Sequence, residues 1–263
     1  MCVAGFFFMI VGGGAYTAWE LTEKRKAAAR AEKNSAKEVR AKMGKDMEKL
    51  MTERLDADGR PRRTDFRLET GKSATTHAER AREFLNGYAN DVVAVQNEYL
   101  ASVEKAGLDN VFDLNRMAAD PTFQETDRIL EESRAATVTC LRKLLALADN
   151  LPKRLDEHGF DEAIKRDILQ GYNEGKESPN SMLTETWNLE LSLLDEMKKL
   201  CDHLHATRSV WTLEDGQFVF QTEEARKKYI EIQERIDAID AQKSQIQQEA
   251  QNKAMKRFKA MQQ

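Results

Sequence analysis

Apolar side chains recur at three- and four-residue intervals along most of the chain, and this period predicts a mostly helical protein. Glycine (13) and proline (4) are scarce among the 263 residues, which favours long elements with few turns. The expected fold is all-α, with a long helical arm leading to an antiparallel helical bundle. Helices are expected over residues 20–55, 75–106, 121–150, 160–172, 179–206 and from 222 onward.

The first residues differ from this pattern because the stretch from Cys2 to Trp19 carries no charge. Its 18 residues would span about 27 Å as a helix, close to the ~30 Å hydrocarbon layer of a bilayer. Tyr16 and Trp19 lie at its end, where aromatic rings favour the membrane interface. We therefore predict a transmembrane anchor over residues 1–19. The alternatives are a cleaved signal peptide, although the usual basic start is missing, and a core helix.

A strongly basic segment follows the apolar stretch. Residues 24–45 hold nine Lys/Arg and two acids, so this window carries +7 while the whole chain carries −4. Basic residues beside a span favour the cytoplasmic side, which predicts a single-pass inner-membrane protein with a cytoplasmic body; a periplasmic or extracytoplasmic body is the alternative. Because cations beside a span attract anionic lipids, headgroup contact is expected for Lys24, Arg25, Lys26 and Arg30.

Polar and turn-forming residues divide the rest of the chain. We expect a basic juxtamembrane helical arm over 20–57, a hinge over 58–74, and the bundle with its long C-terminal helix over 75–263. The arm and the last helix both carry narrow apolar stripes suited to pairing with other helices. Partner binding, to other membrane or envelope proteins or in a homo-oligomer, is therefore predicted at Val39, Met43, Met47, Leu50, Ile246, Met255 and Phe258.

The helical period stops near residues 209–221. Two runs rich in β-branched and aromatic residues, 210–213 and 217–220, flank Asp215-Gly216, which is a strong signal for a β-hairpin. Two strands alone are only marginally stable. The aromatic side chains of this segment are therefore expected to cover one end of the bundle.

The motif Trp211-x-x-x-Asp215-Gly216-x-x-x-Phe220, followed by a helix containing Tyr229, resembles the closing segment of small, all-helical bacterial envelope proteins of unknown function. The resemblance covers about residues 209–232. It implies a bundle closed by a hairpin and an envelope setting. Some of those proteins lie outside the inner membrane, which favours the extracytoplasmic alternative.

Few residues suggest chemistry. Cys201 and His205 share a helix face at a two-ligand spacing, but no second pair completes a metal site, and a buried thiol beside histidines at a helix end is the preferred interpretation. Cys140 and Cys201 are expected to be buried thiols, with a bridge between them left open for an oxidising compartment. No catalytic, cofactor or metal residue is predicted. The acidic body argues against nucleic acid as a partner.

The sequence thus favours a membrane-anchored, non-enzymatic interaction or scaffold protein of the cell envelope that binds partner proteins through helical surfaces. The alternative is a membrane-tethered sensor or small-ligand-binding helical module, with a pocket near Tyr172, Trp187 and Trp211. An enzyme of unfamiliar type is a third class, for which no nucleophile–base or metal constellation is apparent.

Overall fold

The computed structural model describes residues 30–56, 61–70, 76–162, 164–166, 168–170 and 182–262. These residues are mostly helical and include one two-stranded antiparallel sheet, so the all-α class with a small hairpin is confirmed. No helix within these ranges combines the length and the apolar character needed to cross a bilayer. The expected anchor at residues 1–19 lies outside the described residues.

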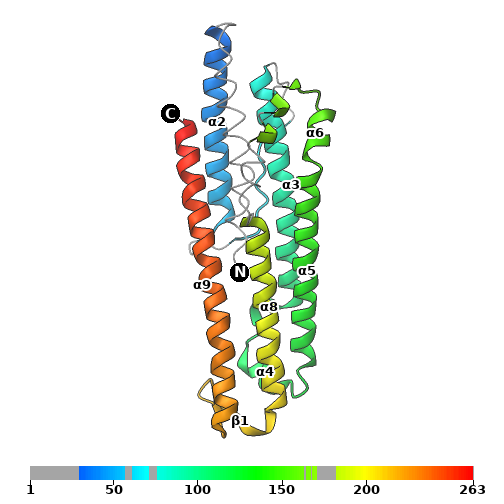
Figure 1. Cartoon of the computed structure of the whole chain (residues 1–263), viewed down its shortest axis with the longest axis vertical. Helices are drawn as coiled ribbons and strands as arrows, with labels where there is room; N and C mark the ends of the chain where they lie inside the picture. The colour runs from blue at the N-terminus through cyan, green and yellow to red at the C-terminus, as the bar shows by residue number, and fades with distance from the viewer. Residues whose placement is uncertain are drawn as a thin grey trace. The chain divides into compact units, whose positions relative to one another are not determined.

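Within the described ranges, five helices of 25 or more residues dominate the structure (Figure 1). They are α2 (Arg30–Arg54), α3 (His77–Ala106), α5 (Gln124–Asp149), α8 (Met182–Ala206) and α9 (Glu223–Gln262). The shorter elements are η1 (Leu108–Asn110), α4 (Leu114–Ala119), α6 (Leu151–Glu157), η2 (Arg208–Val210), β1 (Trp211–Glu214) and β2 (Gln217–Phe220).

The chain forms two compact units, and α3, α5, α8 and α9 each contribute to both. Unit 1 consists of the described residues within Met1–Asn97, Arg142–Thr186 and Gln245–Gln263. Unit 2 consists of Glu98–Leu141 and Trp187–Ser244. The described residues of the expected hinge, 61–70, belong to unit 1.

Local sequence signals set both ends of α3. Thr76 and Glu79 form a capping box at the start of α3: the Thr76 amide donates to the Glu79 carboxylate (3.0 Å), and the Glu79 amide donates to the Thr76 hydroxyl (3.2 Å). Gly107 follows the last residue of α3 with a φ of 89°, a left-handed conformation that glycine adopts without steric cost. The expected start and stop of this helix are both confirmed.

The expected start of one helix at a proline is shifted by a few residues. The helix expected to start at Pro121 begins at Gln124, although the Asp120 carboxylate still accepts hydrogen bonds from the amides of Glu125 (3.1 Å) and Thr126 (3.3 Å). Asp120 therefore accepts hydrogen bonds from the first turn of α5 although three residues lie between it and the helix. Pro152 lies in the first turn of α6, where its missing N–H costs nothing.

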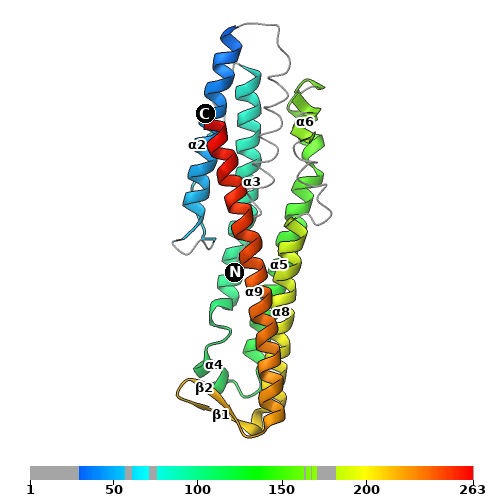
Figure 2. The same cartoon turned by 60° about the vertical axis from the view of Figure 1, so that its left-hand side comes forward.

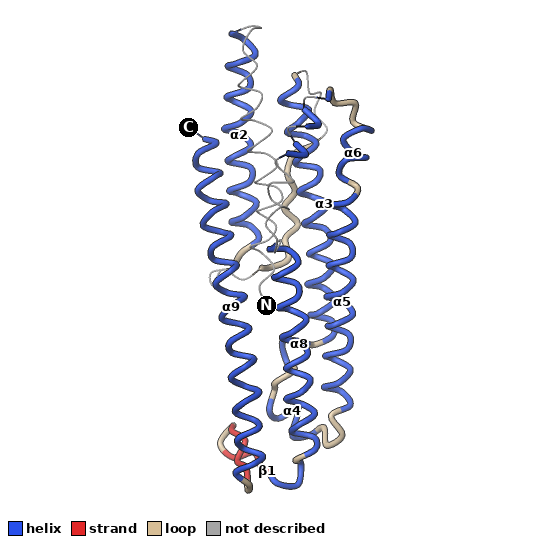
Figure 3. The backbone as a smooth tube through the Cα atoms, in the orientation of Figure 1, coloured by secondary structure: helices blue, strands red, loops and turns tan. Residues whose placement is uncertain are grey.

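The β-hairpin occurs where the sequence predicted it, and β1 and β2 are the red segments in Figure 3. Trp211 pairs with Phe220 and Glu214 with Gln217. Asp215 (φ 48°) and Gly216 (φ 74°) supply the two positive φ angles that a tight hairpin turn requires. Trp211 is buried, and its indole N–H donates to the carbonyl of Leu204 on α8 (2.8 Å), so the hairpin is fastened to a helix of unit 2.

Candidate functional site

The linker segment (residues 61–70), which connects α2 to α3, is held by asparagine side chains of α3. The Leu68 amide donates to Asn90 Oδ1 (2.9 Å), and Asn90 Nδ2 donates to the Leu68 carbonyl (3.0 Å). Asn97 makes the same two-point contact with the backbone of Thr64, at 3.3 and 2.8 Å. Asn86 Nδ2 adds a bond to the Glu69 carbonyl (3.0 Å).

These three asparagines share one face of α3 because their spacings are four and seven residues. A side-chain amide that both donates to and accepts from one residue satisfies that residue's backbone groups as a neighbouring strand would. Leu68, held by Asn90, is buried. The described part of the expected hinge is thus fixed to α3 by five hydrogen bonds to the backbone.

The apolar stripe of α2 is covered within unit 1. Met43, Met47 and Leu50 are 6%, 0% and 0% exposed. A bidentate contact adds a polar connection to α3, because Arg82 donates from Nε (3.1 Å) and from a terminal nitrogen (2.7 Å) to one carboxylate oxygen of Asp46. These methionines and Leu50, predicted as partner contacts, are packed inside the chain in this arrangement.

The end of α9 supplies part of that cover. A Cβ atom built at Gly44 of α2 would lie 2.8 Å from the Phe258 carbonyl oxygen and 3.2 Å from the Met261 Cβ. Gln262 Nε2 donates to the Glu48 carboxylate at 2.8 Å. Figures 1 and 2 both show the end of α9 beside α2. The absence of a side chain at Gly44 is what permits this close backbone approach.

The remaining predicted contact residues have different environments. Phe258 is buried at 0% exposure. Val39, Ile246 and Met255 are half-buried and so present part of their apolar surface to solvent. Of the predicted lipid contacts, Lys24, Arg25 and Lys26 lie outside the described residues; Arg30 begins α2, and its side chain is not described.

Unit 2 contains a buried ion pair that is not among the features expected from the sequence. Lys243 Nζ of α9 lies 2.6 Å from a carboxylate oxygen of Glu190 on α8. The other carboxylate oxygen accepts a hydrogen bond from the Tyr99 hydroxyl (3.0 Å). Lys243, Glu190 and Tyr99 are 0%, 1% and 2% exposed. The cluster therefore joins three helices through charges and a hydroxyl removed from water.

Burial and the neighbouring carboxylate both act on the tyrosine. Desolvation, followed by the charge of Glu190, raises the pKa of Tyr99 well above its ordinary value, while a hydrogen bond with the Thr137 side chain acts in the opposite direction. The indole of Trp187 packs edge-on against Tyr99, with ring centroids 5.1 Å apart. Tyr99 is consequently a neutral hydrogen-bond donor at ordinary pH.

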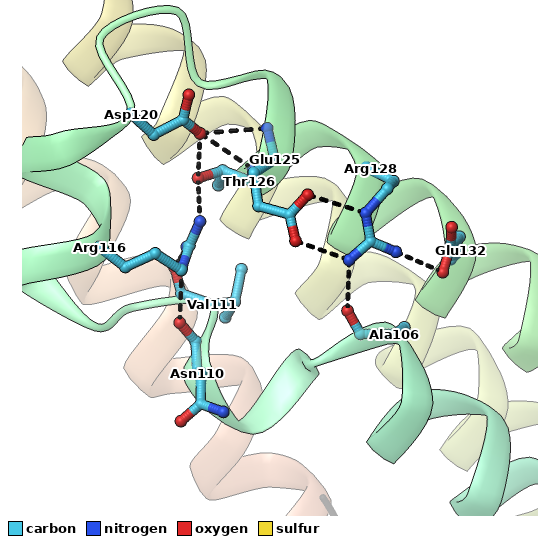
Figure 4. A network of polar contacts seen from close by, with 9 residues as sticks. All are labelled: Ala106, Asn110, Val111, Arg116, Asp120, Glu125, Thr126, Arg128 and Glu132. Atoms are coloured by element: carbon cyan, nitrogen blue, oxygen red, sulfur yellow. Dashed lines mark hydrogen bonds and ion pairs between the residues drawn. The ribbon is translucent and has the colours of Figure 1, made fainter.

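Two arginines organise the short elements between α3 and α5 (Figure 4). Arg116 donates to the carbonyls of Asn110 (3.1 Å) and Val111 (2.5 Å) and to the Thr126 hydroxyl (2.9 Å). Arg128 donates to the Ala106 carbonyl (3.2 Å) at the end of α3. The same terminal nitrogen of Arg128 lies 2.7 Å from a carboxylate oxygen of Glu125, and the other terminal nitrogen lies 2.7 Å from Glu132. The contacts with Ala106, Asn110 and Val111 satisfy carbonyls that the helix ends leave free. The two arginines therefore order the segment that connects α3 to α5.

The cysteine and histidine residues considered as ligands take structural positions. Cys140 and Cys201 are both buried free thiols, and desolvation raises the pKa of Cys201 to about 12. His203 Nε2 lies 2.8 Å from the carbonyl of Ala225, and the His205 ring stacks on Phe123 with centroids 5.6 Å apart. Within the described ranges, no group of three or more His, Cys, Asp or Glu residues is arranged to hold a metal ion.

The two tryptophans of the expected ligand pocket are buried: Trp187 is 0% exposed and packs against Tyr99, and Trp211 is 2% exposed and packs against Phe218 of β2. Tyr172 lies outside the described residues. Comparison with family models, curated proteins and solved structures finds no match.

Proposed function

We propose that this protein is a membrane-anchored, non-enzymatic scaffold of the cell envelope that binds partner proteins through helical surfaces. The uncharged stretch 2–19 and the basic window 24–45 support the membrane part, because this order is typical of a span and its flanking segment. The body is proposed to lie in the cytoplasm, with an extracytoplasmic body as the alternative.

The observation that carries the scaffold part is the packing of α2 against the other helices of unit 1. A flexible tether would let the body move freely relative to an anchor, whereas α2 is packed along its methionine stripe and its linker segment is bonded to α3. Such packing would hold unit 1 at a set position near the membrane. A scaffold needs this property, because fixed geometry lowers the entropic cost of assembling partners.

Val39, Ile246 and Met255 are the proposed partner contacts that keep exposed apolar surface. The partners are other membrane or envelope proteins, or a second copy of this chain. A photo-crosslinking residue at each of the three positions in the full chain, expressed in cells, tests this surface. Specific adducts are expected from these positions, and fewer from the exposed unit 2 controls Glu131 and Gln233.

An adduct of twice the chain mass would identify a homo-oligomer, and one of another mass would identify a different partner. The absence of adducts from all three positions, with the chain folded and in the membrane fraction, would overturn the proposed interaction surface.

A small-ligand-binding module is the second candidate function. It is favoured by the indole N–H of Trp187, which is buried and has no acceptor among the described residues. Buried donors ordinarily have partners, and a polar ligand entering unit 2 would supply one. A thermal-shift screen in which no small molecule stabilises the full chain would count against this function.

A further inference from the structure

The end of α9 is a basic segment without acidic residues. Residues 250–262 include four cations and no Asp or Glu. Lys253, Lys256 and Lys259 are exposed, and Arg257 is half-buried. Within the described ranges, none of the four makes an ion pair. Their charge is therefore available to an external anion.

The fold places this segment beside the basic helix α2. Glu48 and Gln262, which are 214 positions apart in sequence, are hydrogen-bonded at 2.8 Å, and Gly44 contacts Phe258 closely. On α2, Lys42, Lys45 and Lys49 are exposed at spacings of three and four residues, so they share a helix face.

Little internal charge offsets these α2 lysines. Lys42 approaches Glu69 at 3.7 Å, with both side chains more than half exposed, and such surface pairs are weak. Lys49 lies over the Phe66 ring, 4.8 Å from its centroid. Lys45 has no ion-pair partner among the described residues. Two basic segments from opposite ends of the sequence thus adjoin in unit 1.

We propose that the adjoining basic segments of α2 (Lys42, Lys45, Lys49) and α9 (Lys253, Lys256, Lys259) form a second contact with anionic phospholipid headgroups. This inference rests on the proposed membrane anchoring. A lipid surface is favoured over nucleic acid because α2 continues the basic window that follows the uncharged stretch 2–19. A lysine near an anionic membrane surface gains roughly fivefold in local affinity. The contact would press unit 1 against the bilayer that holds the anchor.

The test is hydrogen exchange of the full chain in nanodiscs of phosphatidylcholine alone or with phosphatidylglycerol added. Amides of residues 250–262 are expected to exchange about fivefold more slowly with the anionic lipid. This protection should disappear at high salt, where charges are screened, and in the variant Lys253→Gln, Lys256→Gln, Lys259→Gln. The matched control Arg226→Gln, Lys227→Gln, Lys228→Gln changes three exposed cations elsewhere on α9 and should keep the protection.

Equal exchange in both nanodiscs, with the chain stably incorporated, would overturn the headgroup contact and leave the anchoring intact. Failure to incorporate into nanodiscs would instead contradict the proposed function. In that case, protection of residues 250–262 by added anionic vesicles would still support the headgroup contact, and no protection by the vesicles would overturn it.

Protection by inorganic phosphate in phosphatidylcholine nanodiscs would identify a free-anion site. Protection only by duplex DNA would identify nucleic acid as the partner, and either result would overturn the lipid contact.

Discussion

Lys243 of α9 and Glu190 of α8 form an ion pair of 2.6 Å in which neither side chain is exposed by more than 2%. Replacing Lys243 with Met should lower the free energy of unfolding by about 3–5 kcal/mol, because it leaves a buried carboxylate without its counter-charge. Urea unfolding of the full chain in detergent measures this. The double variant Lys243→Met, Glu190→Gln should recover most of the loss, since it removes both charges and keeps an acceptor for Tyr99. A loss below ~1 kcal/mol in the single variant would contradict the ion pair's burial.

Loss of an asparagine contact with the linker segment should destabilise that segment and leave unit 2 unchanged. Asn90→Ala removes both hydrogen bonds to Leu68, which should destabilise the linker by about 1–3 kcal/mol because buried backbone groups lose their partners. Hydrogen exchange at the Leu68 amide should accelerate, while amides in unit 2 stay protected. Asn188→Ala, at an exposed position on α8, is the matched control. Unchanged exchange in the linker of Asn90→Ala would show that this segment is held by other contacts.

Alanine substitutions at two helical glycines, Gly87 and Gly44, should change the stability of the chain in opposite directions. At Gly87 of α3 an added Cβ meets no atom within 4 Å, so Gly87→Ala should stabilise the chain by about 0.5–1 kcal/mol through helix propensity. At Gly44 the Cβ would lie 2.8 Å from the Phe258 carbonyl, so Gly44→Ala should destabilise by about 1–3 kcal/mol. Thermal unfolding of both variants tests the α2–α9 contact. Equal stabilisation by the two substitutions would rule out the close approach of Gly44 to the Phe258 carbonyl.

The acid dependence of stability should include a contribution from Glu196. Hydrogen bonds from Lys199 and then Arg235 hold the pKa of this carboxyl below its ordinary value. A lowered pKa in the folded state means that the unfolded state binds the proton first. The contribution of Glu196 to the free energy of unfolding is therefore fully present above about pH 4.3. It is lost as the pH falls through the folded-state pKa. The free energy of unfolding of Glu196→Gln should change less between pH 6 and pH 3 than that of the parent chain. The control Glu234→Gln, at an exposed site on α9, should resemble the parent. An unchanged dependence in Glu196→Gln would assign the acid sensitivity to other groups.

Features that depend on adjacent residues could be predicted from the sequence. Asp215 and Gly216 determine a hairpin turn by themselves, and Thr76 with Glu79 caps α3 within a single turn. The apolar stripe containing Met43 and Met47 was also identified. The residues that cover this stripe were not identified, because the contact of Gly44 with Phe258 joins segments more than 200 positions apart. No local sequence pattern encodes such a contact. Met43→Glu or Met47→Glu is now expected to destabilise unit 1 as well as any interface.

The buried ion pair could have been found from a signal present in the sequence. Lys243 continues the stripe that contains Ile232, Ile236 and Ile239, and Glu190 lies between Trp187 and Leu194 on the stripe of α8. Opposite charges at core positions of two helices point to a buried pair. The linker contacts had no comparable signal, because Asn90 and Asn97 are ordinary polar residues on a helix until an extended segment is placed beside them.

Alkaline carbonate extraction of cell membranes tests the membrane-anchored scaffold most directly. The full chain is expected to remain in the membrane pellet, because carbonate releases proteins held only by surface charge. Phe7→Arg with Ile10→Arg should release it, since each arginine costs about 2.5–3.5 kcal/mol in the centre of a span. Ser192→Arg with Ser244→Arg, at exposed sites on α8 and α9, should leave it in the pellet. Recovery of the unmodified chain in the carbonate supernatant would contradict the anchored account.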